Sequence, residues 1–298
     1  MKLALGPLQY YWRRQTVLDF YERMAQLPLD VLYVGETVCA RRSELRIPDW
    51  IALARELGGS GKEIVFSTQV LLESEADVKA LARVLDSGLR IEANDFGAVR
   101  GVQRRVPFVA GPTLNVFNSE TLHLLAELGA DRWVAAPELD AQTLGAMLAQ
   151  RPPGMQAEIL AHGRIALAYS ARCFTARHFN LQKDGCEFRC MDDPDGLALR
   201  TQEGEAFLTL NGVQTQSARV HDLLGELPQA AALGVDVLRI SPQSKGMEEI
   251  VGLYRDAVEG RIGAQEARAR MGRLGSDGYC NGFWHARPGI ELRPSMGE

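Results

Sequence analysis

Short apolar runs recur along the chain, and a segment with helical spacing of apolar residues follows most of them. Between residues 74 and 88, for example, Leu81 and Leu85 fall on one helical face, and Ser74 can cap the first turn. Runs of this kind, which we interpret as strands, lie at residues 3–6, 31–35, 63–68, 89–94, 107–115, 132–139, 156–162 and 235–241. The pattern therefore predicts an alternation of strands and helices.

The alternation repeats at intervals of roughly 20 to 30 residues, which is typical of βαβ units and a parallel sheet. The strands are almost continuously apolar, as expected when helices cover one side and a core the other. At least eight strand candidates favour a TIM-like (β/α) barrel, whether regular, distorted or incomplete, in one domain over residues 1–298. A Rossmann sheet fits less well, because no GxGxxG follows the first strand.

One region departs from this alternation of strands and helices. Residues 171–205 have no clear period and contain three of the five cysteines, Cys173, Cys186 and Cys190. Loops of this length in a compact domain are usually functional or disordered, and the aromatic and arginine content argues against disorder. We expect a cysteine-rich loop insertion here, and an irregular C-terminal tail over residues 275–298, which are rich in glycine and proline.

Composition narrows the functional class. The net charge is −5, from 33 basic and 38 acidic residues, and no basic run stands out, so a nucleic-acid partner bound by charge is not expected. No apolar stretch approaches the roughly 20 residues that cross a bilayer, and no export signal is evident, so we expect a cytoplasmic protein without an integral membrane segment. In that compartment an odd number of cysteines points to metal binding or reactivity instead of disulfides.

The cysteines can converge. Cys39 follows the strand at residues 31–35, and the loop with Cys173, Cys186 and Cys190 follows the strand at 156–162. The carboxyl ends of barrel strands form one rim, so four thiols can meet there. Four thiolates suit zinc or an iron–sulfur cluster, and the spacing alone does not decide between them. Aromatic and cationic neighbours such as Arg172 favour an anionic cluster.

Other candidates have a structural and a functional interpretation. Cys280 is more simply a small buried apolar residue. His162 ends a strand and can position a substrate or a cluster sulfur, or it can hydrogen-bond within a turn. Arg172 can offset cluster charge or lie in solvent. Glu36 and Asp95 follow strands at the rim, although helix capping explains Asp95 more simply.

The segment AEILAHGRIALAYSARCF resembles the signature of the collagenase-like peptidase family, ExxxHGxxCxxYSGRC. The matching residues are Glu158, His162, Gly163, Tyr169, Ser170, Arg172 and Cys173. Ala166 stands where the signature has its first cysteine, and Ala171 stands where it has glycine. These departures, with YVGETVCARR, PFVAGPTLNVFN and CNGFW, resemble a ubiquinone-biosynthesis branch of the family over residues 5–284.

The resemblance implies a 4Fe–4S cluster held by Cys39, Cys173, Cys186 and Cys190, with Cys39 compensating for the cysteine absent at Ala166. It also implies a heterodimer with a homologous UbiU-like subunit. Together the two subunits would support oxygen-independent hydroxylation of the ubiquinone ring, with a prenylated aromatic substrate and accessory proteins of the pathway as further candidate partners.

Two alternatives remain open at this point. One is a zinc-stabilised binding subunit without a redox role. The other is a hydrolase of peptide or modified RNA, by analogy with the family. The chain has neither the HExxH of zinc peptidases nor the GxSxG of serine hydrolases, so the residues themselves do not favour proteolysis.

Overall fold

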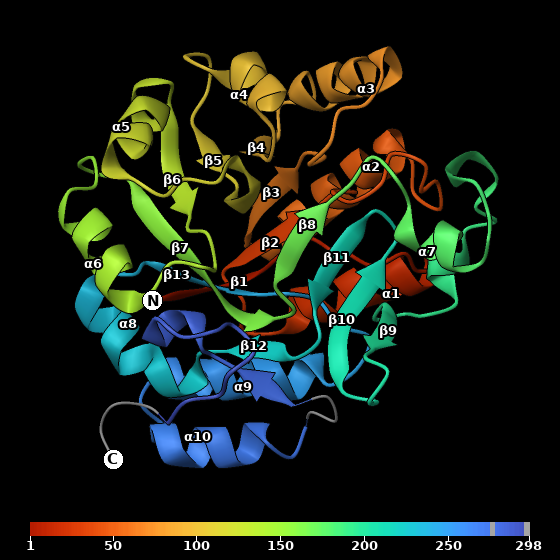
Figure 1. Ribbon diagram of the computed structural model, residues 1–298. Helices are drawn as coiled ribbons and strands as arrows, with labels where there is room; N and C mark the ends of the chain where they lie inside the picture. Colours follow the sequence, from red (N-terminus) through yellow and green to blue (C-terminus); the bar gives the residue numbers. More distant parts are fainter. Residues whose placement is uncertain (275–277, 295–298) are drawn as a thin grey trace.

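The computed structural model describes residues 1–274 and 278–294. Within these ranges, eight parallel strands close into a barrel surrounded by helices (Figure 1). The strands are β1 Lys2–Leu5, β2 Val31–Val34, β3 Glu63–Ser67, β4 Arg90–Ala93, β5 Phe108–Ala110, β6 Ala130–Val134, β7 Gln156–Gly163 and β13 Val237–Ile240. Neighbours in the chain pair from β1 to β7, and β13 closes the ring by pairing in parallel with both β7 and β1. The TIM-like barrel expected from the sequence is thus confirmed, and it is complete.

Helices form the outer layer. They are α1 Arg14–Gln26, α2 Ile47–Leu57, α3 Glu75–Leu85, α4 Phe96–Val102, α5 Ser119–Glu127, α6 Ala141–Ala149, α8 Leu227–Leu233, α9 Met247–Val258 and α10 Ala264–Met271. Ser74 caps α3 by accepting from the Asp77 amide, and Asp95 caps α4 by accepting from the Gly97 amide at 2.6 Å. The structural role of Asp95 is therefore confirmed.

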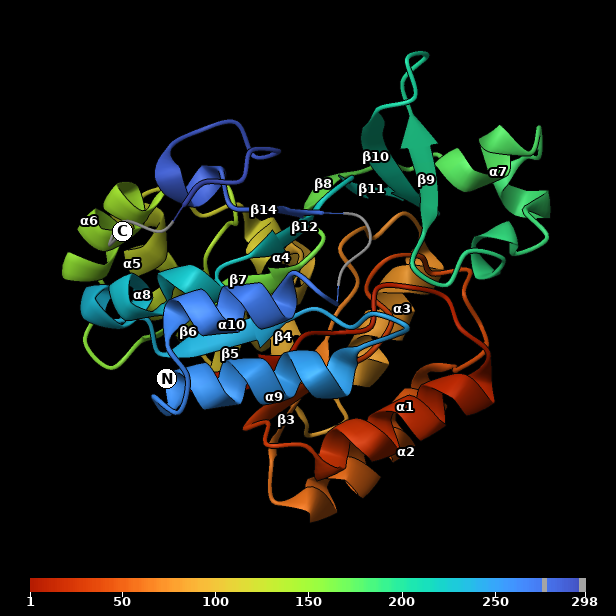
Figure 2. The same cartoon turned by 90° about the horizontal axis from the view of Figure 1, so that it is seen from below.

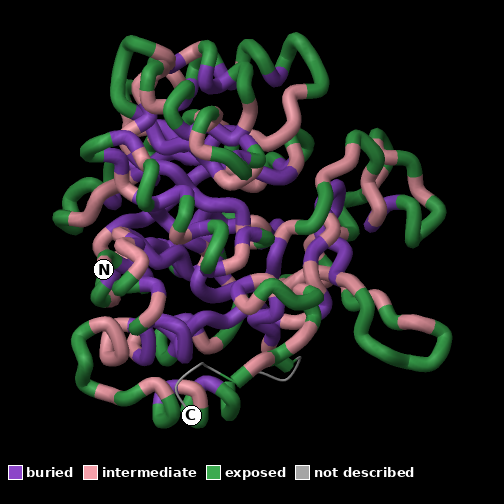
Figure 3. Tube along the Cα trace, turned by 60° about the vertical axis from the view of Figure 1, so that its left-hand side comes forward, coloured by how far each residue is buried: buried purple, intermediate pink, exposed green. Residues whose placement is uncertain are grey.

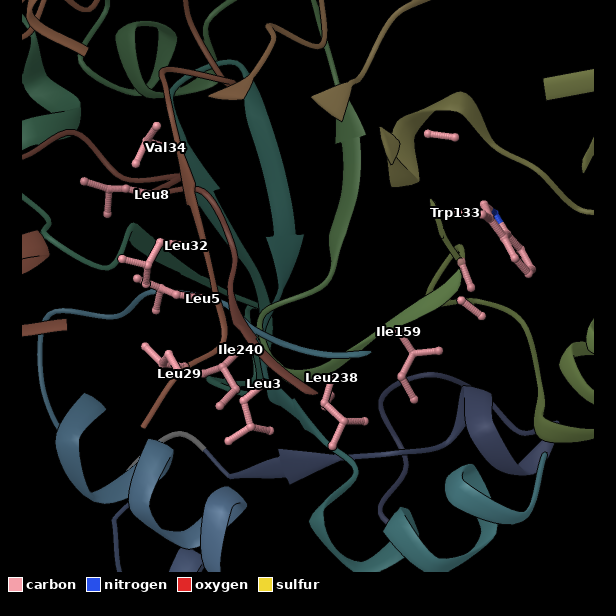
Figure 4. Packing of buried hydrophobic residues seen from close by; sticks show 14 of the residues in the cluster. Leu3, Leu5, Leu8, Leu29, Leu32, Val34, Trp133, Ile159, Leu238 and Ile240 are labelled. Atoms are coloured by element: carbon pink, nitrogen blue, oxygen red, sulfur yellow. The ribbon is translucent and has the colours of Figure 1, made fainter. Parts of the chain in front are cut away.

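Strand residues alternate between two environments. Those pointing outward pack against the helices, and Figure 4 shows part of this layer, including Leu3, Leu5, Leu32 and Trp133. Those pointing inward form a separate small apolar cluster of Ala4, Val31, Tyr33, Val65, Val109, Val134 and Val237. Period-two alternation of the strands produces both layers.

Charged side chains share the barrel interior with these small residues. The guanidinium of Arg239 donates to Glu158 Oε1 and to Glu92 Oε1, both at 2.6 Å. The Tyr33 hydroxyl donates to Glu158 Oε2 at 2.6 Å and accepts from Arg132 at 3.2 Å. Both carboxylates are completely buried, so their stability depends on these partners.

A second sheet, antiparallel, stands beside the barrel. Its strands are β8 Ala166–Tyr169, β9 Leu197–Arg200, β10 Ala206–Asn211 and β11 Gln214–Ser217, in the order β8-β11-β10-β9, and helix α7 spans Phe174–His178. We call residues 166–217 the cysteine lobe. Figure 2 shows it projecting from the barrel, and Figure 3 shows that much of its surface is intermediate or exposed. The region that the sequence indicated as an insertion, residues 171–205, thus includes α7 and β9.

Two short strands, β12 Val220–Asp222 and β14 Tyr279–Cys280, extend the barrel sheet beyond β7. Strand β12 runs antiparallel to β7, and β14 pairs with β12. Cys280 is completely buried, as expected of an apolar residue. Of the predicted tail 275–298, residues 275–277 and 295–298 lie outside the described residues. In the described part of the chain no helix combines the length and apolar character that a membrane crossing requires.

Gly163 ends β7 in a conformation that few other residues adopt. Its φ is +132°, and a Cβ at this position would lie 2.4 Å from the Cβ of Ser241. We expect Gly163→Ala to lower the free energy of unfolding by about 2–5 kcal/mol, from backbone strain plus overpacking. Urea unfolding measures the effect. Gly154→Ala is the control, because that φ is +80° but the space is open. An equal loss in both variants would contradict the packing argument.

Candidate metal centre

Four cysteines line one small cavity between the barrel rim and the cysteine lobe. Cys39 comes from the loop after β2, and Cys173, Cys186 and Cys190 come from the lobe. Arg41, Arg42, Thr175, Ala176, Lys183, Phe188, Arg189 and Gly212 complete the lining. All four thiols are free and half-buried. The convergence expected from the sequence is thus present.

Glu36 fixes the loop that carries Cys39. Its Oε1 accepts from the amide nitrogens of Val38 at 2.9 Å and Cys39 at 3.1 Å. Both amides lie beyond the end of β2, where hydrogen bonds to a neighbouring strand are no longer available. The Glu36 carboxylate is their acceptor instead. The carboxylate therefore orients the loop toward the lobe.

Local backbone geometry places the lobe cysteines. Cys173 caps α7, and its Sγ accepts from the Ala176 amide at 3.3 Å. Between Cys186 and Cys190 the chain passes through the left-handed region twice, at Glu187 (φ 52°) and Phe188 (φ 55°). Each such residue costs roughly 1–2 kcal/mol of backbone strain. The double left-handed turn lets both cysteines line the same cavity, and strain of this kind is typical of functional sites.

Two ion pairs hold the lobe against the barrel at this point. Arg41 donates to the carboxylate of Asp184 at 2.7 Å and to the Asp184 carbonyl at 2.7 Å. Lys183 pairs with Glu73, from the loop after β3, and donates to a carbonyl within the lobe. Both contacts lie beside the cysteines and link the lobe to the barrel there; the pair between Arg41 and the largely exposed Asp184 contributes at most about 1 kcal/mol.

Two of the four thiols, those of Cys39 and Cys190, have raised pKa values. Burial raises the pKa of Cys190 to about 11, and the neighbouring Arg42 only partly opposes this. Burial likewise raises the pKa of Cys39. These two thiols are therefore protonated at neutral pH, and a bound metal would displace their protons.

The donor set fits an iron–sulfur cluster. Four thiolates are the usual ligands of a 4Fe–4S cluster, in which each binds a different iron, so the ligands surround a volume. Here the four thiols line one cavity together with three arginines and Phe188. Across the described ranges no three His, Cys, Asp or Glu side chains are placed to hold a single ion.

The two other residues singled out in the sequence lie elsewhere. His162 is buried, and its Nδ1 lies 3.0 Å from Asp222 Oδ1, with Tyr254 in edge contact. Arg172 is exposed. Neither lines the cysteine cavity. Arg42, in contrast, is buried and lines the cavity. In the sequence, the one feature that points to Arg42 is its position three residues after Cys39.

A second buried histidine, His221, makes the stability of the fold depend on pH. Burial lowers the pKa of His221 to about 4. The unfolded chain has a pKa near 6.5 here and binds the proton first, so the folded state loses about 3 kcal/mol as the pH falls from about 6.5 to 4. Urea unfolding across this pH range tests the expectation. The His221→Gln variant should show a shallower pH slope, and an unchanged slope would assign the acid sensitivity to other groups.

A second cavity opens at the mouth of the barrel, with a volume of about 350 Å3. Arg239 and Ser241 of the β13 end, Tyr169 of the lobe, and the apolar Val70 and Leu160 are among its lining residues. Mouths of this kind are where TIM-like barrels bind their ligands. The lobe thus contributes to both cavities.

Fold and site together define a TIM-like barrel protein with a four-thiol cavity at the carboxyl-terminal rim of the strands. The chain belongs to peptidase family U32, whose model matches residues 19–294. This confirms the resemblance at the level of the family.

Individual relatives are distant. The chain is 24% identical over 191 residues to the tRNA hydroxylation protein P1 of Bacillus subtilis (strain 168), and the match covers 58% of this chain and 44% of that protein. A putative dihydrodipicolinate synthetase from Pseudomonas aeruginosa shares the fold, with a TM-score of 0.50 and 10% identity over 92% of this chain and 81% of its own. A solved U32 peptidase aligns over 82% of this chain and 94% of its own, with 14% identity and a TM-score of 0.44.

Proposed function

We propose that this chain is an iron–sulfur subunit required for oxygen-independent hydroxylation in ubiquinone biosynthesis, similar to UbiV and acting as a heterodimer with a homologous UbiU-like subunit. The observation that carries the proposal is the meeting of Cys39 with Cys173, Cys186 and Cys190 around one cavity. The family assignment and the name of the Bacillus subtilis relative, which refers to hydroxylation, support it.

When bound, a thiolate-held cluster supplies one-electron transfer at a potential set by hydrogen bonds and exposure. The chain provides the rest. The four cysteines would hold the cluster, Glu36 fixes the loop of Cys39, and the ion pair between Arg41 and Asp184 links the lobe to the barrel beside the site. Substrate would bind at the barrel mouth, where polar groups lie beside apolar ones.

Metal and sulfide analysis of protein purified without air tests this proposal. We expect a brown protein with broad absorption near roughly 400 nm and about four irons and four sulfides per chain. A colourless protein with one zinc per chain would overturn the cluster and support a zinc-stabilised binding subunit.

The partner and the reaction need their own test. We expect the chain to co-purify with a UbiU-like homologue, and ring hydroxylation without oxygen to require both chains. Hydrolysis of a peptide or RNA by this chain alone would instead support the hydrolase alternative.

A further inference from the structure

Arg42 is a buried cation in the wall of the cysteine cavity. Only 2% of its side chain is exposed. One terminal nitrogen donates to the Gln9 carbonyl at 2.6 Å, and the other donates to Asn211 Oδ1 at 2.7 Å. The Cys190 side chain lines the same cavity as the guanidinium. Acceptors from a barrel loop and from the lobe therefore hold the guanidinium in one position.

The protein supplies only part of the countercharge that Arg42 requires. Glu36 lies 3.4 Å away, a long contact, and the same oxygen already accepts the Val38 and Cys39 amides. The Nε of Arg42 is buried and has no acceptor among the described residues. A buried guanidinium without full compensation is costly, so an anion beside it is favoured.

A chain of hydrogen bonds continues from Arg42 to the barrel mouth. Asn211 donates to Gln214 Oε1 at 2.8 Å, and Gln214 donates to the Tyr169 hydroxyl at 2.8 Å. Tyr169 lines the mouth cavity. The buried amides fix the orientation of Arg42, because each amide is itself held by more than one partner.

We propose that Arg42 is a positioning residue that holds a fixed positive charge against the cluster and raises its reduction potential. The inference rests on the cluster proposed above. A nearby cation favours the more negative, reduced state, and burial limits screening by salt. Arg172, the arginine indicated by the sequence, is exposed and does not line the cavity.

Anaerobic redox titration followed by electron paramagnetic resonance tests the proposal. Arg42→Gln is expected to lower the midpoint potential, and Glu36→Gln is expected to raise it, because it removes the negative charge closest to Arg42. Arg172→Gln is the matched control, and its shift should be smaller than that of Arg42→Gln by more than about threefold, since exposed charges are screened.

Each outcome decides between explanations. An unchanged potential in a cluster-loaded Arg42→Gln variant, or a lowered one in Glu36→Gln, overturns the role of Arg42 and leaves the cluster intact. If Arg42→Gln binds no iron, Arg42→Lys decides, because it retains the positive charge: iron binding with a potential near the wild-type value supports the proposal, and a failure to bind iron assigns Arg42 a structural role and rejects it. A wild-type protein without iron and sulfide would instead refute the proposed function.

Discussion

A Cys39→Ala variant purified without air is expected to lose most of its iron and its absorption near roughly 400 nm. Cys39 is the one thiol that the barrel contributes to the cavity, and the lobe provides the other three. Three thiols leave one iron without its protein ligand, which destabilises a 4Fe–4S cluster. Iron and sulfide content per chain, with the visible spectrum, measures the loss.

Cys280→Ala is the matched control for this experiment. Its thiol is completely buried in β14 and does not line the cavity, so iron content should remain at the wild-type value. If Cys280→Ala removes the iron and Cys39→Ala keeps it, the assignment of ligands is wrong.

Arg239→Met is expected to have the largest effect on stability. The substitution leaves Glu92 and Glu158 buried inside the barrel without their shared cation. Removing one partner of a buried ion pair costs about 3–5 kcal/mol, because the remaining charge is uncompensated. The free energy of unfolding in urea measures this loss.

A surface pair provides the comparison. Arg23 pairs with Glu248 at 3.3 Å, and both side chains are about half exposed. Arg23→Met should therefore cost at most about 1 kcal/mol. Losses of equal size in the two variants would show that the interior charges are far better solvated than their burial indicates.

The barrel could be predicted because its strands are local signals. Runs such as residues 31–35 and 63–68 are largely apolar, and the helix after the second run has its own cap and periodicity. The position of Cys39 and Cys173 at one rim then follows from parallel strand direction alone. These features need no knowledge of contacts that are distant in the chain.

The cysteine lobe could not be predicted in the same way. Its strands are short, and β8 and β9 have exposed residues at alternate or central positions, so hydrophobic periodicity is weak. The pairing of β8 with β11 joins residues that lie 45 or more positions apart in the chain, such as Tyr169 and Gln214. Arg42 was missed for a related reason, since its partners Gln9 and Asn211 are distant in sequence.

The interior charges illustrate a third limit. Glu92, Glu158 and Arg239 lie on three different strands that are far apart in the sequence. Only barrel closure brings β4, β7 and β13 together so that one guanidinium reaches both carboxylates. A single charge in a strand therefore gave no sign that it has a partner.

The division of the ligands between barrel and lobe has a mechanical consequence. Inorganic iron bound at this seam would act as a cross-link between two bodies, closing a loop of about 130 residues between Cys39 and Cys173. Extraction of iron by a chelator should then loosen the lobe while the barrel stays folded, and limited proteolysis would cut first within residues 171–205. Binding of iron between the barrel and the lobe would in this way determine how rigid the exposed surface of the lobe is.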